Sequence, residues 1–121
     1  MRPTFGNGKI CYIEIPAVDI EVSAAFYQDV FGWSIRKRDD GSIGFDDGVN
    51  QVSGSWIPGR KPSTEVGILI SIMVLDAAAT VAAIAAHGGA IVQPIGVDAS
   101  AITAIFTDPA GNLWSIYQHG G

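Results

Sequence analysis

Residues Tyr12 to Trp33 read YIEIPAVDIEVSAAFYQDVFGW, and the same arrangement returns 57 positions later, from Leu69 to Ala90. In both copies a short apolar segment leads into an aspartate, and a glycine follows after a stretch with helical spacing. Asp19 thus corresponds to Asp76, and Gly32 corresponds to Gly89. A repeat of this kind predicts a chain built from two copies of one supersecondary unit.

The stretch between aspartate and glycine predicts an amphipathic helix. Asp19 is an N-cap residue type, and Gly32 readily adopts the left-handed conformation that ends a helix. Apolar side chains at four-residue spacing would form the buried face of about three turns, namely Val22, Phe26 and Val30. In the second copy, Asp76 and the pair Gly88-Gly89 are expected to bound an alanine-rich helix.

Strands are predicted on both sides of each helix, because runs of β-branched and aromatic residues alternate with Asp- and Gly-rich turns. In the first half we expect strands at 9–15, ended by Pro16, and at 33–38, 42–45 and 49–57. In the second half we expect strands at 67–74, 90–97, 101–107 and 113–118, with a helix at 77–86 and a turn at Asp98-Ala99-Ser100. Both halves are therefore predicted to be β-α-β-β-β units, joined by the polar connector 58–64.

The composition limits the classes of function. The chain has 121 residues, of which 48% are hydrophobic and 16% charged, so a disordered chain is excluded. The net charge of −5 disfavours nucleic acid as a partner, since nucleic-acid binding needs a basic face. The longest apolar run, Ile68 to Leu75, is too short to span a bilayer, and residues 1–9 lack the apolar segment of a signal peptide. We expect a cytoplasmic protein with no membrane partner.

Two groups of residues are similar to the ends of a known superfamily: Tyr12-Ile13-Glu14-Ile15-Pro16, Asp19, Phe26-Tyr27 and Val30-Phe31-Gly32-Trp33 at the start, and Asp108-Pro109-Ala110-Gly111-Asn112 with Gln118 at the end. They resemble the vicinal oxygen chelate superfamily, which contains glyoxalase I, bleomycin resistance proteins, fosfomycin resistance enzymes and extradiol dioxygenases. The resemblance implies an α+β fold in which two βαβββ modules form curled mixed sheets around a cavity. It also implies a homodimer. The expected domain spans 1–121, with modules at about 8–57 and 65–119.

The resemblance further implies a divalent ion held by His, Glu or Gln side chains from four strands. The corresponding positions in this sequence are Tyr12, Leu69, Ser115 and a residue within 52–54. Leu69 has no donor atom, and neutral hydroxyls are poor ligands for such ions. We therefore expect no metal and no other cofactor. A metal site is compatible with the sequence only if the ligand positions are shifted so that Glu14 is one of them, or if two chains together supply the ligands.

The cysteine and the two histidines do not supply the missing ligands. Cys11 is the only cysteine, which excludes an intrachain disulfide and a thiolate cluster, and its apolar surroundings predict a small core residue. His87 is expected at the negative end of the second helix. His119 lies next to the C-terminus and is expected to fray.

Alternation along the strands predicts the side chains that line the cavity. This set is mostly apolar and aromatic with a few polar groups, which is typical of a small-molecule site: Tyr12, Glu14, Gly54, Trp56, Leu69, Ser71, Met73, Leu113, Ser115 and Tyr117. Trp56 and Tyr117 fit a packed core equally well.

Glu14 is the one candidate catalytic residue, because a carboxylate in an apolar cavity can act as a general acid or base. The alternative is an ion pair with Arg36, Lys37 or Arg38 on a nearby strand.

Three functions are compatible with these features. The first is a glyoxalase- and bleomycin-resistance-like protein that binds a small molecule without the usual metal. The second is a metal-dependent lyase, isomerase or dioxygenase with displaced ligands. The third is a non-catalytic interaction or regulatory domain, for which we expect a barrel with no cavity. Whether the protein is an enzyme is left open.

Overall fold

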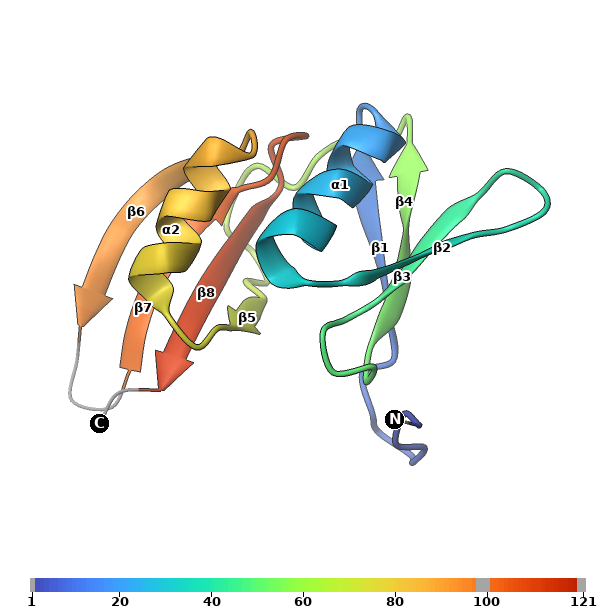
Figure 1. Cartoon of the computed structure of the whole chain (residues 1–121), viewed down its shortest axis with the longest axis horizontal. Coiled ribbons are helices and arrows are strands. Elements are labelled where there is room, and N and C mark those ends of the chain that lie inside the picture. Colours follow the sequence, from blue (N-terminus) through green and yellow to red (C-terminus); the bar gives the residue numbers. More distant parts are fainter. Residues whose placement is uncertain (1, 98–100, 120–121) are drawn as a thin grey trace.

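The computed structural model describes residues 2–97 and 101–119 and contains two mixed sheets, each with one helix (Figure 1). In chain order the elements are β1 (Tyr12–Ala17), α1 (Ile20–Phe31), β2 (Ser34–Lys37), β3 (Ile43–Asp46), β4 (Ser53–Pro58), β5 (Ser71–Met73), α2 (Ala77–Ala86), β6 (Ala90–Val97), β7 (Ala101–Thr107) and β8 (Leu113–His119). The predicted β-α-β-β-β order is confirmed in both halves. The predicted turn at 98–100 lies outside the described residues.

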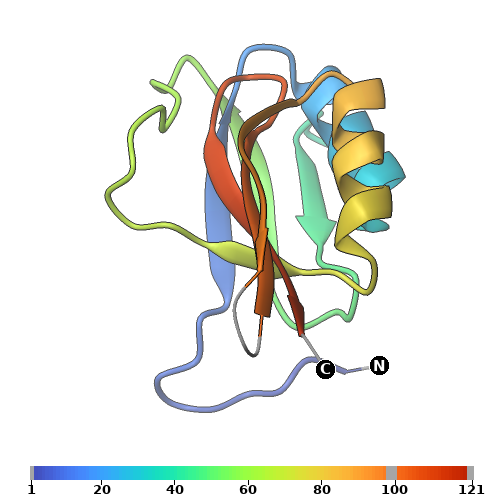
Figure 2. The same ribbon diagram turned by 90° about the vertical axis from the view of Figure 1, so that its left-hand side faces the viewer.

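Each half forms its own four-stranded sheet. The strand orders are β1-β4-β3-β2 and β5-β8-β7-β6, and in each sheet the first strand pairs in parallel while the other pairs are antiparallel. The two sheets lie side by side, and both helices lie on the same side of the molecule (Figures 1 and 2). The sheets of one chain do not close around a shared cavity, so each keeps an open face opposite its helix.

The helices begin and end where the repeat predicts. The carboxylate of Asp19 accepts hydrogen bonds from the backbone N–H groups of Glu21 and Val22, at 3.0 and 3.3 Å, and Gly32 is left-handed with φ 72°. Asp76 caps α2 by accepting from the N–H of Ala79 at 3.0 Å. Neither helix is long and apolar enough to cross a membrane within the described part of the chain.

Some predicted strand boundaries are wrong. β1 continues through Pro16, because β1 is an edge strand and proline is tolerated there. Cys11 is exposed ahead of β1 and is not a core residue. β5 spans only 71–73, and the apolar residues before it, such as Ile68, are exposed. His119 is the last residue of β8, paired with Ala101, so the expected fraying is also wrong.

The predicted strand 49–57 begins four residues late for a local reason. The carboxylate of Asp47 accepts from the backbone N–H groups of Gln51 and Val52, at 2.7 and 3.3 Å, and the carbonyl of Asp47 accepts from the N–H of Asn50. These bonds hold residues 47–52 in a turn. Side-chain capping of this kind competes with strand pairing.

An aromatic core joins the two halves. Tyr27 on α1 stacks on Trp33 with ring centroids 4.6 Å apart, and Trp33 stacks on Phe45 at 4.5 Å. From the other sheet, Trp114 approaches Tyr27 edge-on at 5.9 Å, and Phe106 lies 6.2 Å from Phe26. Helix α1 therefore packs against both sheets. Burial of these aromatic rings contributes much of the free energy that stabilises the contact between the modules.

A buried hydrogen-bond network reinforces this junction. The Tyr27 hydroxyl donates to Asp108 Oδ2 at 2.6 Å, and Asn112 Nδ2 donates to the same oxygen at 3.0 Å. Asn112 Nδ2 also donates to the Pro16 carbonyl at 2.8 Å, and Asn112 Oδ1 accepts from the N–H of Ser63 at 2.9 Å. The network thus ties α1, β1, the connector and the β7–β8 turn together.

Candidate functional site

The strand register defines the open face of the first sheet. Partners across a ladder point to the same side, so two cross-strand rows lie opposite α1. One row runs Tyr12, Ser53, Asp46 and Ser34, and the other runs Glu14, Ser55, Gly44 and Arg36. We call these eight residues face A. The alternate positions, including Ile15 and Phe45, are buried in the core.

Face A is polar, and its two carboxylates are both held by arginines. Arg36 Nη2 lies 2.7 Å from Asp46 Oδ1, which also accepts from the Ser53 hydroxyl at 2.7 Å. Arg60 Nη1 lies 3.0 Å from Glu14 Oε1, and both of these side chains are about half exposed. The apolar surroundings expected for Glu14 are therefore absent. An ion pair replaces them, with a partner from the connector in place of the strand residues 36–38.

The open face of the second sheet is more apolar. We call it face B, and it includes five of the residues predicted to line the cavity: Ser71, Met73, Leu113, Ser115 and Tyr117. The register adds Thr103 and Ile105 to this face. The Ser115 hydroxyl donates to the carbonyl of Ile116 at 3.2 Å, and the Tyr117 hydroxyl lies 3.1 Å from His119 Nδ1. Leu69 precedes β5 and is partly exposed.

Gly54 and Trp56 do not lie on an open face, contrary to the prediction. Gly54 pairs with Ile13 and Phe45, so it points toward the helix side, and Trp56 is buried there with its ring 4.9 Å from Phe45. A one-residue slip in a strand exchanges its two faces. Ser53 and Ser55 occupy the open face instead. A sequence signal for the correct faces was present but not used. In the last strand of each module, β4 and β8, a serine on the open face stands next to a buried tryptophan, Ser55 beside Trp56 and Ser115 beside Trp114.

The residues at the positions where the resemblance implies metal ligands do not fit a divalent ion. They offer the phenol of Tyr12, the aliphatic Leu69, and the Ser115 hydroxyl, which is buried and already donates to a carbonyl. Across residues 2–97 and 101–119, no group of three or more His, Cys, Asp and Glu side chains could hold a metal. His87 caps the end of α2, as predicted, with Nδ1 2.8 Å from the carbonyl of Ala83.

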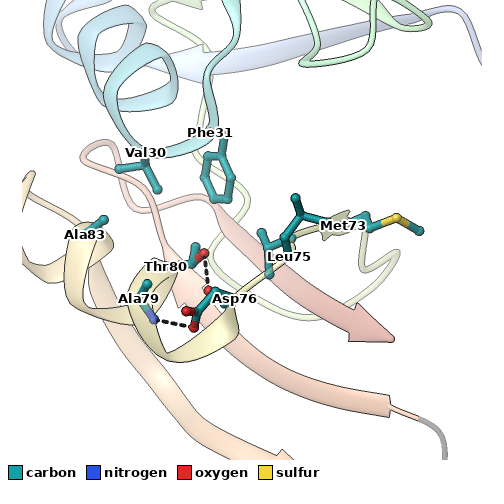
Figure 3. Close-up of a pocket in the computed structure, with 9 residues that line it drawn as sticks. Val30, Phe31, Met73, Leu75, Asp76, Ala79, Thr80 and Ala83 are labelled. Carbon is teal, nitrogen blue, oxygen red and sulfur yellow. Dashed lines mark hydrogen bonds between the residues drawn. The ribbon is translucent and has the colours of Figure 1, made fainter. Parts of the chain in front are cut away.

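Two hollows lie at the junction of the modules. A cleft of about 420 Å³ separates the end of α1 from the start of α2, with Phe31 facing Leu75 and Asp76 turned toward its own helix (Figure 3). A second hollow of about 400 Å³ is lined by rings that include Trp33 and Trp114. Ser71 and Met73, both on face B, also border this second hollow. Face B therefore adjoins the second hollow, whose lining is mostly apolar.

Comparison with known proteins identifies the family. The model of the Glyoxalase/Bleomycin resistance protein/Dioxygenase superfamily matches residues 9–116. A glyoxalase/bleomycin resistance protein/dioxygenase family enzyme from Burkholderia phytofirmans PsJN is 20% identical, with TM-score 0.76 and coverage of 92% of this chain and 98% of that one. Hypothetical protein SA1046 from S. aureus is 22% identical, with TM-score 0.75 and coverage of 93% and 95%.

A third relative is similar over a short segment only. A glyoxylase-like domain-containing protein from Didymella fabae is 49% identical over 37 residues, which is 31% of this chain and 29% of the relative. The match therefore spans less than a third of that protein. The family model, by contrast, extends from before β1 into β8. The chain belongs to the Glyoxalase/Bleomycin resistance protein/Dioxygenase superfamily.

Proposed function

We propose that this chain binds a small, largely apolar molecule without the divalent metal that the superfamily's metal enzymes use. One observation carries the proposal. The positions where those enzymes hold ligands offer a phenol, an aliphatic chain and a hydroxyl, while both carboxylates on face A are engaged by arginines. Such a set favours hydrogen bonding and apolar contact over coordination of a cation.

The proposed ligand lies between face A of one copy of the chain and face B of a second copy. Face B supplies apolar and aromatic contact through Met73, Leu113 and Tyr117, and face A supplies hydroxyl and charged groups. The catalytic role of Glu14 stays a prediction, and no reaction step is built on it. Because the two faces of one chain do not enclose a space, the site is complete only when a second copy is present.

We infer a homodimer in which face A of one copy meets face B of the other. Large apolar side chains stay exposed around β5, including Ile68 at 89%, Met73 at 72% and Leu75 at 95%. Exposed apolar surface concentrated in one region is typical of an interface. In addition, β1 and β5 are the end strands of their sheets, so each has an edge available for pairing.

Sedimentation velocity tests the dimer. The wild-type chain is expected to sediment as a dimer, and Ile68→Glu with Leu75→Glu is expected to shift it to the monomer, because two charges would be buried in the interface. Val18→Glu changes another strongly exposed apolar residue, in the β1–α1 connection, and this control is expected to stay dimeric. A monomeric wild type would contradict the assembly.

A thermal-shift screen on one preparation tests the binding function. Small aromatic and aliphatic compounds are expected to raise the melting temperature, since a ligand at 100 times its Kd stabilises the folded state by about 2.7 kcal/mol. Ni²⁺, Zn²⁺, Mn²⁺ and Fe²⁺ are expected to leave it unchanged. A metal-induced rise that Glu14→Ala abolishes would instead support the metal-dependent alternative.

A further inference from the structure

We propose that face A contains a subsite for a carboxylate group, centred on Ser55 and Arg38, so that the ligand is a small organic acid with an apolar body. This inference rests on the proposed function and names the class of molecule bound. It requires a cation free to pair with the ligand, a neutral donor, and a sheet position that lets the two lie side by side.

The neutral donor is the Ser55 hydroxyl. Ser55 stands between Glu14 and Gly44 in its cross-strand row, and only 8% of its surface is exposed. In the described part of the chain its hydroxyl makes no hydrogen bond, whereas the neighbouring Ser53 hydroxyl donates to Asp46. In the described residues the fully buried side-chain polar atoms without a partner are the indole Nε1 atoms of Trp56 and Trp114, so the Ser55 hydroxyl keeps an accessible surface from which it can donate to a ligand.

Gly44 allows the guanidinium of Arg38 to lie beside Ser55. Gly44 pairs with Ser55, and the guanidinium of Arg38 extends over it, since a Cβ on Gly44 would come within 2.7 Å of Arg38 Nη2. A larger side chain at position 44 would displace the guanidinium. The absent side chain therefore lets a hydroxyl and a guanidinium approach the same point on the sheet.

Arg38 is the cation whose guanidinium is free to bind a ligand. Arg36 and Arg60 are paired with Asp46 and Glu14, but the guanidinium of Arg38 forms no salt bridge within residues 2–97 and 101–119 and makes only a long hydrogen bond to the Ser42 hydroxyl, at 3.4 Å. Asp40 is an acid that interacts electrostatically with Arg38. Its carboxylate is occupied by the Ser42 N–H and hydroxyl at 2.9 and 2.7 Å, bonds that lower the pKa of Asp40 more than Arg38 does.

The chemistry of this group favours a carboxylate. A guanidinium presents a planar pair of N–H donors that matches the two oxygens of a carboxylate, and a hydroxyl can donate to the same oxygens. The protein as a whole is acidic, with net charge −5, but over face A the ion pairs of Arg36 with Asp46 and of Arg60 with Glu14 leave the charge of Arg38 uncompensated, and this charge attracts an anion. Face B of the second copy would then cover the apolar part of the same ligand.

Isothermal titration at low ionic strength tests the subsite with matched pairs of probes: benzoate, phenylacetate and octanoate against their amides. At least one acid is expected to bind about tenfold more tightly than its amide, which corresponds to one charge-assisted hydrogen bond. Arg38→Gln and Ser55→Ala are expected to reduce that preference severalfold. Arg38→Lys keeps the charge but loses the planar fork, so an intermediate preference is expected.

Lys37→Gln is the matched control, because it removes the same charge from the adjacent residue, whose register places it on the opposite side of β2. It is expected to keep the full preference for acids. Equal binding of acids and amides by the wild type would overturn the subsite and leave the proposed function standing. Inorganic phosphate binding as tightly as the best acid would overturn the assignment to organic acids. If neither acids, amides nor the wider compound set bind, the proposed function itself is wrong.

Discussion

Asp108→Ala is expected to lower the free energy of unfolding by about 3 kcal/mol or more, because it leaves several buried donors without an acceptor. The Tyr27 hydroxyl and Asn112 Nδ2 would both lose Asp108 Oδ2, and the N–H groups of Ala110 and Asn112 would lose Oδ1. These donors come from both halves of the chain. The loss would therefore weaken the junction between modules as well as the β7–β8 turn.

Urea unfolding followed by tryptophan fluorescence measures this effect. Asp29→Ala removes an exposed carboxylate from α1 and is expected to change stability by no more than about 0.5 kcal/mol, as for most surface substitutions. If Asp108→Ala were as mild as this control, the network would not be holding the modules together.

The pH dependence of Tyr27→Phe separates the hydrogen bond from simple packing. Burial, and then the nearby Asp108 carboxylate, raise the pKa of Tyr27 well above its ordinary value of 10.0. The folded state therefore keeps the phenol protonated, and its contribution is fully present below pH 10 and is lost as the pH rises above it. Wild-type stability is expected to fall more steeply above about pH 10 than that of Tyr27→Phe, and equal slopes would contradict the assignment.

Gly54→Ala is expected to cost about 3 kcal/mol of stability, because the added methyl group would overlap the Ile13 carbonyl oxygen and the Phe45 ring. The obstacle on one side is backbone in the paired strand β1, which cannot move without breaking the ladder. Gly67→Ala is the control, since a Cβ there meets no atom within 4 Å and the backbone is not left-handed. It is expected to be close to neutral.

The same substitution also tests the register of β4. If Gly54 faced the ligand, as alternation along the sequence predicts, an alanine there would be tolerated by the fold and would alter only binding. Chemical denaturation of Gly54→Ala and Gly67→Ala side by side distinguishes the two cases. Similar midpoints for both variants would place Gly54 on the open face after all.

The element order was predictable because its signals are local and repeated. Asp19 and Asp76 cap the helices with their own side chains, and Gly32 ends α1 by its left-handed conformation, so a few neighbouring residues specify each boundary. Face B was predictable for the same reason, since regular alternation from the Asp108 turn leads directly to Ser115 and Tyr117.

The rest depends on contacts that no local pattern reveals. The residue of β4 that pairs with Phe45 determines which side of β4 faces the ligand. That pairing depends on the length of the turn before β4, which is held by the Asp47 carboxylate. Likewise, the partner of Glu14 is Arg60, which reaches it from the connector 46 positions away. Long-range pairing therefore determines the surroundings of the candidate site, while local sequence determines its scaffold.

Elemental analysis of the purified chain tests the central claim most directly. The protein would be prepared without a metal-affinity step or a chelator, so that any resident ion stays in place. The absence of His, Glu and Gln at Tyr12, Leu69 and Ser115 predicts far less than one bound divalent ion per chain. About one tightly held divalent ion per chain would contradict the claim that this member of the superfamily binds its ligand without a metal.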